Sequence, residues 1–185
     1  VIHSVHKKKL QWSHKFDRKL QNMIVASSNS DASWAADLVG LGGIEKMMRR
    51  QGYCFYDDTH GGLWLGRAYR RGGPANRDPL FNISHGASAR QAARFYGLLH
   101  QGKLVNRHWS FRMLGLMSPP KHHHKFVGAL RKRDGLQFLA RKSGTWRTFH
   151  ADSALVRAPG RLYVLIGLTD SSKGEGMMRN LARRI

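Results

Sequence analysis

The sequence predicts an α+β fold, with a helical segment followed by a three-stranded antiparallel meander and a C-terminal helix. Three observations support this order. Apolar residues recur at helical spacing in several segments before residue 118, strand-like segments occupy residues 136–169, and the last ten residues have a helical pattern. With 185 residues and 41% apolar composition, the chain is long enough for one domain with a hydrophobic core.

The first expected helices follow an apolar entry and a Ser/Asn cluster within residues 23–43. We expect Ser30 or Asp31 to cap the first of these helices and Gly42–Gly43 to end it. A second, short helix is expected in residues 44–52, where Gly52 ends the pattern.

A long, partly ordered excursion separates these helices from two stronger helical patterns. The excursion spans residues 53–82 and contains paired glycines, two prolines and a short strand pattern in GLWLGRAY. Residues 88–101 are amphipathic at helical spacing, and residues 106–117 form a further helical pattern that Pro119–Pro120 stop.

Strand patterns then replace the helical ones. We expect strands at Leu136–Arg141, Trp146–Arg157 and Arg161–Thr169, with turns at Ser143–Gly144 and at residues 158–160. Because short turns join antiparallel neighbours, these strands are expected to form a meander.

The net charge, the single cysteine and the length of the apolar runs limit the classes of function that are open to the chain. The 32 Lys and Arg against 11 Asp and Glu give a net charge of +21, which predicts general affinity for polyanions and leaves open a basic nucleic-acid-associated protein. The basic residues are spread among core-forming segments rather than gathered in one block. The single cysteine, Cys54, excludes an internal disulfide framework, and no apolar run is long enough to span a membrane.

Two short polar motifs occur in a fixed order along the chain, one before the helices and one in the first expected strand. Ser27-Ser28-Asn29 follows an apolar stretch and precedes a helix, and Lys142-Ser143-Gly144 ends the first expected strand. Alone, each motif is typical of an ordinary helix cap or strand end. Together, with the flanking helix and strand patterns, they resemble the penicillin-recognising serine hydrolases, the β-lactamases and D-alanyl-D-alanine peptidases. The resemblance covers roughly residues 20–185.

The resemblance implies acyl transfer on a β-lactam or a D-alanyl peptide amide through a serine ester. It implies that Ser27 relays a proton and that Lys142 attracts the substrate carboxylate and influences Ser27. It further implies substrate hydrogen bonds from a second group of residues: Asn29, Ser143 and Thr145, with close backbone approach at Gly144 and an oxyanion donor in the backbone N–H of Thr145. The implied partner is a small-molecule or peptidoglycan-like substrate, without a cofactor or metal, in the cell envelope or periplasm.

The family's first motif, Ser-x-x-Lys, has no convincing match. Ser4-Val5-His6-Lys7 lies too close to Ser27 for the helices that intervene in the family, and Ser118 precedes two prolines that oppose the required helix. We therefore expect the chain to start downstream of the nucleophile helix, so that the fold is incomplete. We divide the chain into a basic lead-in, residues 1–20, and a β-lactamase-like domain, residues 21–185. A non-catalytic descendant that binds ligands through the same groove is the other alternative.

Two further groups of polar residues have both a functional and a structural interpretation. His122–His124 are adjacent histidines on an irregular segment, where convergence on one metal ion is unusual. His150 and Asp152 are expected on one face of a strand, either supporting the site or making structural hydrogen bonds.

Overall fold

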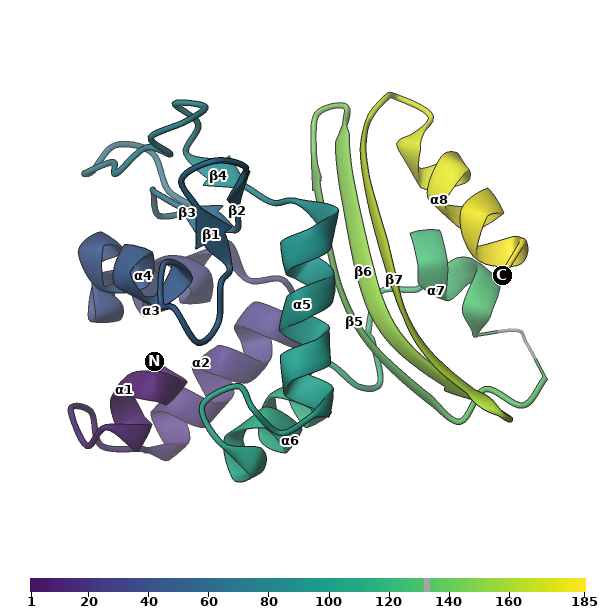
Figure 1. Cartoon of the computed structure of the whole chain (residues 1–185), viewed down its shortest axis with the longest axis horizontal. Helices are drawn as coiled ribbons and strands as arrows, with labels where there is room; N and C mark the ends of the chain where they lie inside the picture. The colour runs from purple at the N-terminus through teal and green to yellow at the C-terminus, as the bar shows by residue number, and fades with distance from the viewer. Residues whose placement is uncertain (132–133) are drawn as a thin grey trace.

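A three-stranded antiparallel sheet divides the molecule into two helical layers (Figure 1). The computed structural model describes residues 1–131 and 134–185. The sheet has the order β5-β6-β7, formed by Phe138–Trp146, Phe149–Ala158 and Arg161–Asp170. The prediction of an α+β fold with a three-stranded meander and a closing helix is therefore confirmed.

Each face of the sheet packs against a different layer, because successive side chains on a strand alternate between faces. Leu139, Val156 and Leu165 face helices α7 (Lys125–Leu130) and α8 (Gly174–Arg183), where they pack with Phe126 and Met178. Ala140 and Leu155 face the larger layer, where helix α5 (Ala89–His100) contributes Tyr96 and Leu99. The sheet is thus buried on both faces.

The larger layer holds the other helices. These are α1 (Ile2–His6), α2 (His14–Val25), α3 (Asn29–Val39), α4 (Leu41–Met48) and α6 (Arg107–Leu116). Helix α5 packs directly against strands β6 and β7 of the sheet (Figure 1). Its buried Tyr96 and Leu99 join Tyr53, Phe55 and Leu114 in one apolar core.

The excursion after α4 contains two small strand pairs. Strand β1 (Tyr56–Asp57) pairs with β2 (Gly61–Gly62), and β3 (Trp64–Leu65) pairs with β4 (His85–Gly86). Within GLWLGRAY, only Gly62 of β2 and Trp64–Leu65 of β3 are strand residues.

The predicted boundaries of the first helices are wrong in two respects. Ser28, rather than Ser30 or Asp31, caps α3, since its hydroxyl accepts the N–H of Asp31 at 3.2 Å. The helix ends at Gly40, whose φ of 75° no L side chain adopts easily, and Gly42–Gly43 lie inside α4. A left-handed backbone position therefore ends α3, and the glycine pair does not.

The predicted turn at Ser143–Gly144 is also wrong. Strand β5 stays paired with β6 as far as Trp146, which faces Phe149, and the hairpin turns at residues 147–148, where Arg147 has a φ of 53°. The Lys-Ser-Gly motif therefore lies within a paired strand and not in a turn. Helix α7, directly after the three histidines, was not predicted.

Two remaining predictions are the domain boundary at residue 20 and the absence of a membrane-spanning segment. Helix α2 crosses residue 20, where we divided lead-in from domain, and that division stays a prediction. Among the described residues, no helix is both long and apolar enough to cross a membrane.

Candidate active site

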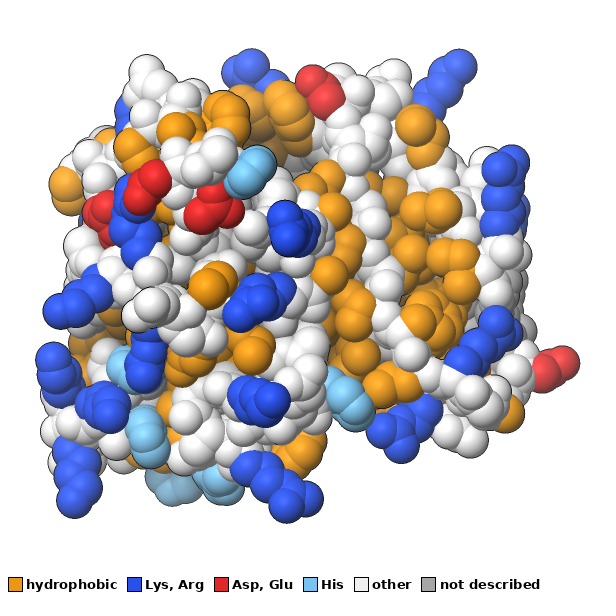
Figure 2. Space-filling model, viewed as in Figure 1, with side chains coloured by type: hydrophobic (Ala, Val, Ile, Leu, Met, Phe, Trp, Pro, Cys, Tyr) orange, Lys and Arg blue, Asp and Glu red, His pale blue; other side chains and the backbone are white. Residues whose placement is uncertain are grey.

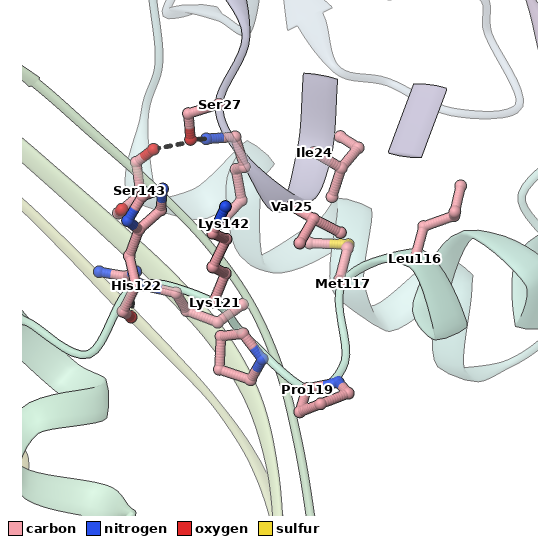
Figure 3. Close-up of a pocket in the computed structure, with 12 residues that line it drawn as sticks. Ile24, Val25, Ser27, Leu116, Met117, Pro119, Lys121, His122, Lys142 and Ser143 are labelled. Atoms are coloured by element: carbon pink, nitrogen blue, oxygen red, sulfur yellow. Dashed lines mark hydrogen bonds between the residues drawn. The ribbon is translucent and has the colours of Figure 1, made fainter. Parts of the chain in front are cut away.

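A pocket lies where the end of α2 meets strand β5 (Figure 3). Three segments line it: the α2 end, the α6–α7 connection and the middle of β5. The lining residues are Ile24, Val25, Ser27, Leu116, Met117, Pro119, Pro120, Lys121, His122, Arg141, Lys142 and Ser143. Apolar side chains therefore form one wall and hydroxyl and amine groups the other.

Ser27 and Lys142 meet at this pocket, although 115 positions separate them in the sequence. The Nζ of Lys142 lies 2.5 Å from Ser27 Oγ and donates to the backbone oxygen of Ser143 at 2.8 Å. Ser27 has a left-handed backbone, with a φ of 54°, between α2 and the Ser28 cap of α3. Strained non-glycine residues of this kind cluster at functional sites.

The amine of Lys142 is easier to deprotonate than an ordinary lysine. Burial of the amine and the nearby charge of Arg141 lower the pKa of Lys142 to about 8, against an opposing influence of Asp152. Both the charged and the neutral amine are therefore accessible near neutral pH.

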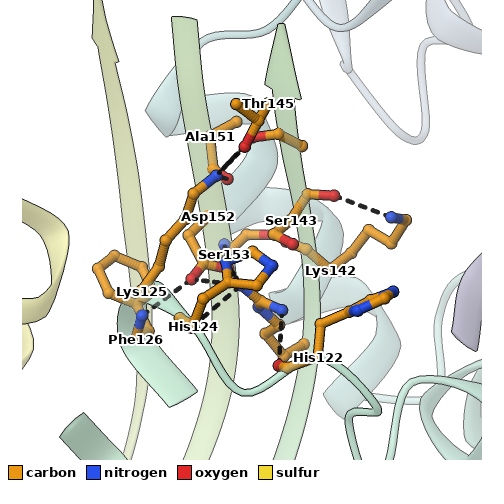
Figure 4. A network of polar contacts seen from close by, with 12 residues as sticks. His122, His124, Lys125, Phe126, Lys142, Ser143, Thr145, Ala151, Asp152 and Ser153 are labelled. Atoms are coloured by element: carbon orange, nitrogen blue, oxygen red, sulfur yellow. Dashed lines mark hydrogen bonds and ion pairs between the residues drawn. The ribbon is translucent and has the colours of Figure 1, made fainter. Parts of the chain in front are cut away.

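A buried ion pair joins Arg141 of β5 to Asp152 of β6, within the polar network that Figure 4 shows. Because successive side chains on a strand alternate, Arg141 lies on the opposite face of β5 from Lys142. Arg141 and Asp152 are only 4% and 1% exposed. The Nε of Arg141 donates to Asp152 Oδ1 at 2.6 Å and Nη2 donates to Oδ2 at 2.9 Å, which is a bidentate geometry. Asp152 also accepts the N–H of Phe126 at 3.0 Å, so the pair fastens α7 to the sheet.

Lys125, the first residue of α7, is fully buried and holds the end of the Lys-Ser-Gly segment. Its Nζ donates to the oxygen of Gly144 at 2.6 Å, to Thr145 Oγ1 at 2.9 Å and to the oxygen of Ala151 at 3.0 Å. All three N–H groups are used, which satisfies the buried cation. Burial nevertheless lowers the pKa of Lys125.

The face of the sheet below Lys142 is fixed by Tyr96 of α5. Its hydroxyl donates to the backbone oxygen of Ser153 at 3.0 Å, and Ser153 Oγ donates to the backbone oxygen of Lys142 at 2.8 Å. Burial raises the pKa of Tyr96, so this phenol stays a neutral donor. The strand that carries Lys142 is thus held from both layers.

The outer edge of β5 is not covered by another strand, since β5 is terminal in the sheet. At the middle of the strand, the N–H of Arg141 points outward and donates to the oxygen of Met117 at 3.0 Å. The alternation of an antiparallel ladder directs the backbone groups of Ser143 and Thr145 to the same outer side. An extended ligand can therefore align along this edge.

The other predicted site residues have the following places. Asn29 is exposed and begins α3, and Gly144 and Thr145 are exposed on β5. Ser4 lies in α1, where the neighbouring His3 and His6 contact Arg50 and Asn106, away from Lys142. Ser118 directly follows the pocket residue Met117 but does not line the Lys142 pocket.

Two of the three adjacent histidines, His122 and His124, contact Arg141 of the buried ion pair. The backbone oxygen of His122 accepts from Arg141 Nη1 at 3.1 Å, and the Nδ1 of His124 lies 3.3 Å from Nη2 of the same guanidinium. His150 lies against Gly174, at the start of α8. Within residues 1–131 and 134–185, no cluster of three or more His, Cys, Asp or Glu side chains has the arrangement of a metal site.

Sequence reasoning missed Lys125 and Arg141. One signal could have indicated a partner for Asp152: it is an acidic residue within an apolar strand pattern, in a chain with 11 acidic residues. Such a carboxylate requires a buried basic partner. The pattern does not reveal which of the many basic residues supplies it.

The chain was compared with known protein families and solved structures. A model of the β-lactamase enzyme family matches residues 8–185. A search of curated proteins finds no match. The structure is similar to that of a β-lactamase from Sphaerobacter thermophilus, with a TM-score of 0.73, 16% identity and coverage of 90% of this chain and 60% of that one.

Two further solved structures show the same fold. PBP-A has a TM-score of 0.66 at 17% identity, with coverage of 88% of this chain and 57% of that one. A β-lactamase from Chitinophaga pinensis has a TM-score of 0.66 at 16% identity, with coverage of 96% and 71%. The chain therefore spans less than two thirds of the length of the Sphaerobacter enzyme and of PBP-A.

Proposed function

Because the chain belongs to the β-lactamase enzyme family, we propose that it serves acyl transfer on β-lactams or D-alanyl peptide amides, with the substrate bound by its carboxylate along the outer edge of β5. One observation carries this proposal: Lys142 and Ser27 meet beside the open edge of the strand that bears the Lys-Ser-Gly motif. A structure of PBP-A, which has the same fold, is an acyl-enzyme complex with penicillin G.

The charge balance of the site favours an anionic ligand. Arg141, Lys125 and Lys142 lie close to a single buried carboxylate, that of Asp152, which Arg141 engages with two hydrogen bonds. Lys125 is also influenced by the charge of Glu175, whereas Lys142 has no carboxylate of its own in this network. A substrate carboxylate beside Lys142 would supply the missing negative charge and would stabilise the protonated amine.

Lys125 assists by orienting the hydroxyl of Thr145. Because Lys125 Nζ donates to Thr145 Oγ1, the hydroxyl hydrogen is free to point away from Lys125. We assign this hydrogen to the ligand carboxylate, together with the hydroxyl of Ser143. Asn29, at the start of α3, would meet the amide of the substrate, and Ser27 would carry a proton to the leaving nitrogen.

Ligand binding by the 185-residue chain tests this proposal. Backbone amide shifts in NMR spectra would be followed during titration with benzylpenicillin and with its ring-opened penicilloate. We expect shifts at residues 27–29 and 142–145. Loss of a charge-assisted hydrogen bond costs about 1.5–3 kcal/mol, so Lys142→Met should weaken binding about 10- to 150-fold.

Lys103→Met is the matched control, since it removes one exposed lysine charge from the loop after α5. We expect this variant to bind as the unmodified chain does. Equal losses in both variants would show that binding follows the overall charge and would contradict the assigned site.

The net charge of +21 supports a second, weaker property, nonspecific affinity for polyanions. On the face shown in Figure 2, Lys and Arg side chains are dispersed among apolar and neutral surface. We therefore expect binding to nucleic acid to fall steeply by about 0.2 M salt. Tight binding that survives this salt would instead favour a nucleic-acid-associated function.

A further inference from the structure

Ser27 and Lys142 have the geometry of a nucleophile and its base. The amine nitrogen and the hydroxyl oxygen lie 2.5 Å apart, on a pocket wall that also includes Ser143 (Figure 3). Direct contact between a serine hydroxyl and a basic side chain is what activates a serine for covalent chemistry. Serine–lysine pairs are a known variant of this arrangement.

The hydrogen bonds of Lys142 fit a neutral amine as well as a charged one. A neutral amine has two N–H groups and one lone pair. One N–H can donate to the oxygen of Ser143, 2.8 Å away, while the lone pair accepts the hydroxyl hydrogen of Ser27. With a pKa of about 8, Lys142 reaches this state at mildly alkaline pH.

Backbone hydrogen bonds hold the segment that carries Ser27. The oxygen of Asn22 in α2 accepts the N–H groups of both Ala26 and Ser28, at 3.1 and 3.2 Å, so the segment around Ser27 is tied to α2. Ser27 also lies just before the start of α3, an 11-residue helix, whose N-terminal dipole stabilises nearby negative charge. Both features favour an attacking Ser27 oxygen over a freely rotating surface hydroxyl.

We propose that Ser27 is itself a nucleophile, with Lys142 as its general base, toward small activated acyl or phosphonyl electrophiles that carry no carboxylate. This activity goes beyond the proposed function, in which Ser27 only transfers a proton. The two roles differ through the state of Lys142. A ligand carboxylate holds Lys142 protonated, whereas an electrophile without a carboxylate leaves the neutral amine free to act as a base.

The reaction with a fluorophosphonate illustrates the chemistry. The lone pair of Lys142 takes the hydroxyl proton of Ser27 while Ser27 Oγ forms a bond to phosphorus. The phosphorus–fluorine bond breaks, and fluoride leaves with the bonding electrons. The protonated Lys142 then returns its proton to solvent, so the net products are the phosphonylated serine and hydrogen fluoride.

Covalent labelling of the 185-residue chain tests the proposal. The chain would be incubated with a small alkyl fluorophosphonate between pH 6 and 10, and the product would be analysed by intact-mass and peptide mass spectrometry. We expect one adduct on Ser27. Its rate of formation should rise about tenfold per pH unit up to about pH 8 and then level off, because only the neutral amine is a base.

Three variants complete the test. Ser27→Ala should abolish the adduct, and Ser4→Ala, in the rejected Ser-x-x-Lys match, should label at the rate of the unmodified chain. Lys142→Arg keeps the positive charge but cannot lose its proton at these pH values, so labelling should fall about 10²- to 10⁴-fold. NMR spectra of each variant would establish that it is folded.

The proposal is overturned if the folded chain forms no adduct at pH 9, if the adduct lies on another residue, or if Lys142→Arg labels as fast as the unmodified chain. Failure of the proposed function is a separate outcome, because it concerns penicilloate binding, which the labelling does not require. If both hold, penicilloate should slow the labelling by keeping Lys142 protonated.

Discussion

Removal of the carboxylate of Asp152 should destabilise the fold more than any surface charge change. Asp152 and Arg141 are 1% and 4% exposed, and two hydrogen bonds of 2.6 and 2.9 Å join them. Asp152→Asn keeps the size of the side chain and deletes its charge. The substitution leaves Arg141 buried without its counter-ion, beside Lys125 and Lys142.

The expected magnitude follows from this burial. Breaking a buried ion pair by removing one partner costs about 3–5 kcal/mol. For a chain of this length, each kcal/mol lowers Tm by about 2–4 °C, so we expect a fall of about 6–20 °C. Arg141→Met should cost less than Asp152→Asn, since the remaining carboxylate keeps Lys125 and Lys142 as neighbours.

Urea denaturation of the two single variants and the double variant would measure these losses. We expect the double variant to lose less stability than the sum of the two single losses, because the second substitution no longer breaks a pair. An unchanged m-value would show that stability, rather than the compactness of the unfolded chain, has changed.

The exposed pair between Arg70 and Asp37 supplies the control. It is also joined by two hydrogen bonds, of 2.5 and 2.9 Å, but its side chains are 45% and 52% exposed. Asp37→Asn should therefore cost only about 0.2–1 kcal/mol. Equal losses from Asp37→Asn and Asp152→Asn would refute the argument that burial makes the Arg141–Asp152 pair important.

Two further substitutions test how the sheet is held from its two sides. Tyr96→Phe deletes a donor to the backbone oxygen of Ser153, which stays within the paired strands β5 and β6. It should cost about 0.5–1.5 kcal/mol, the net value of one hydrogen bond, and urea denaturation would measure the loss. Gly167→Ala places a Cβ 2.9 Å from the ring of Phe126. This overpacking should lower the free energy of unfolding by about 1–3 kcal/mol, which thermal unfolding would measure. A stability equal to that of the unmodified chain would show that α7 moves aside freely.

The order of the longer helices after residue 28 and of the three long strands was predictable, because the hydrophobic period together with Gly and Pro signals distinguishes helices from strands. Helices α5 and α6 occur where the amphipathic pattern and the caps Ser88 and Asn106 place them. The third strand and the turn before it were predictable for the same reason, since Pro159 and Gly160 mark a turn that pairing does not override.

The errors occur where tertiary contacts override local signals. Ser143 and Gly144 have the composition of a turn, but the pairing of β5 with β6 continues to Trp146 and Phe149. Gly42–Gly43 are weak helix formers, yet they lie inside α4 because the helix is redirected earlier, at Gly40. Single residues set the turns, and contacts distant in sequence decide how far each element extends.

The candidate site also combines residues that the sequence indicates with residues that only the fold reveals. The resemblance brought attention to Ser27 and Lys142, and the structure places them in contact across 115 positions. Nothing in the residue pattern indicates Lys125, because its three acceptors lie on two different strands. A lysine after three histidines is typical of an exposed basic patch, and only the fold buries it.

The position of β5 at the edge of the sheet explains why the site combines these groups. Alternation along the strand places Lys142 toward Ser27 and places Arg141 and Thr145 toward α7. The carboxylate of Asp152 is engaged by Arg141, so in the proposed function a ligand anion would balance the charge of Lys142. Under the two proposals, the same amine would be a cation when a carboxylate is bound and, above about pH 8, a base when none is bound. Binding and nucleophilic chemistry at Ser27 should consequently exclude one another, which joint measurement of penicilloate affinity and fluorophosphonate labelling can establish.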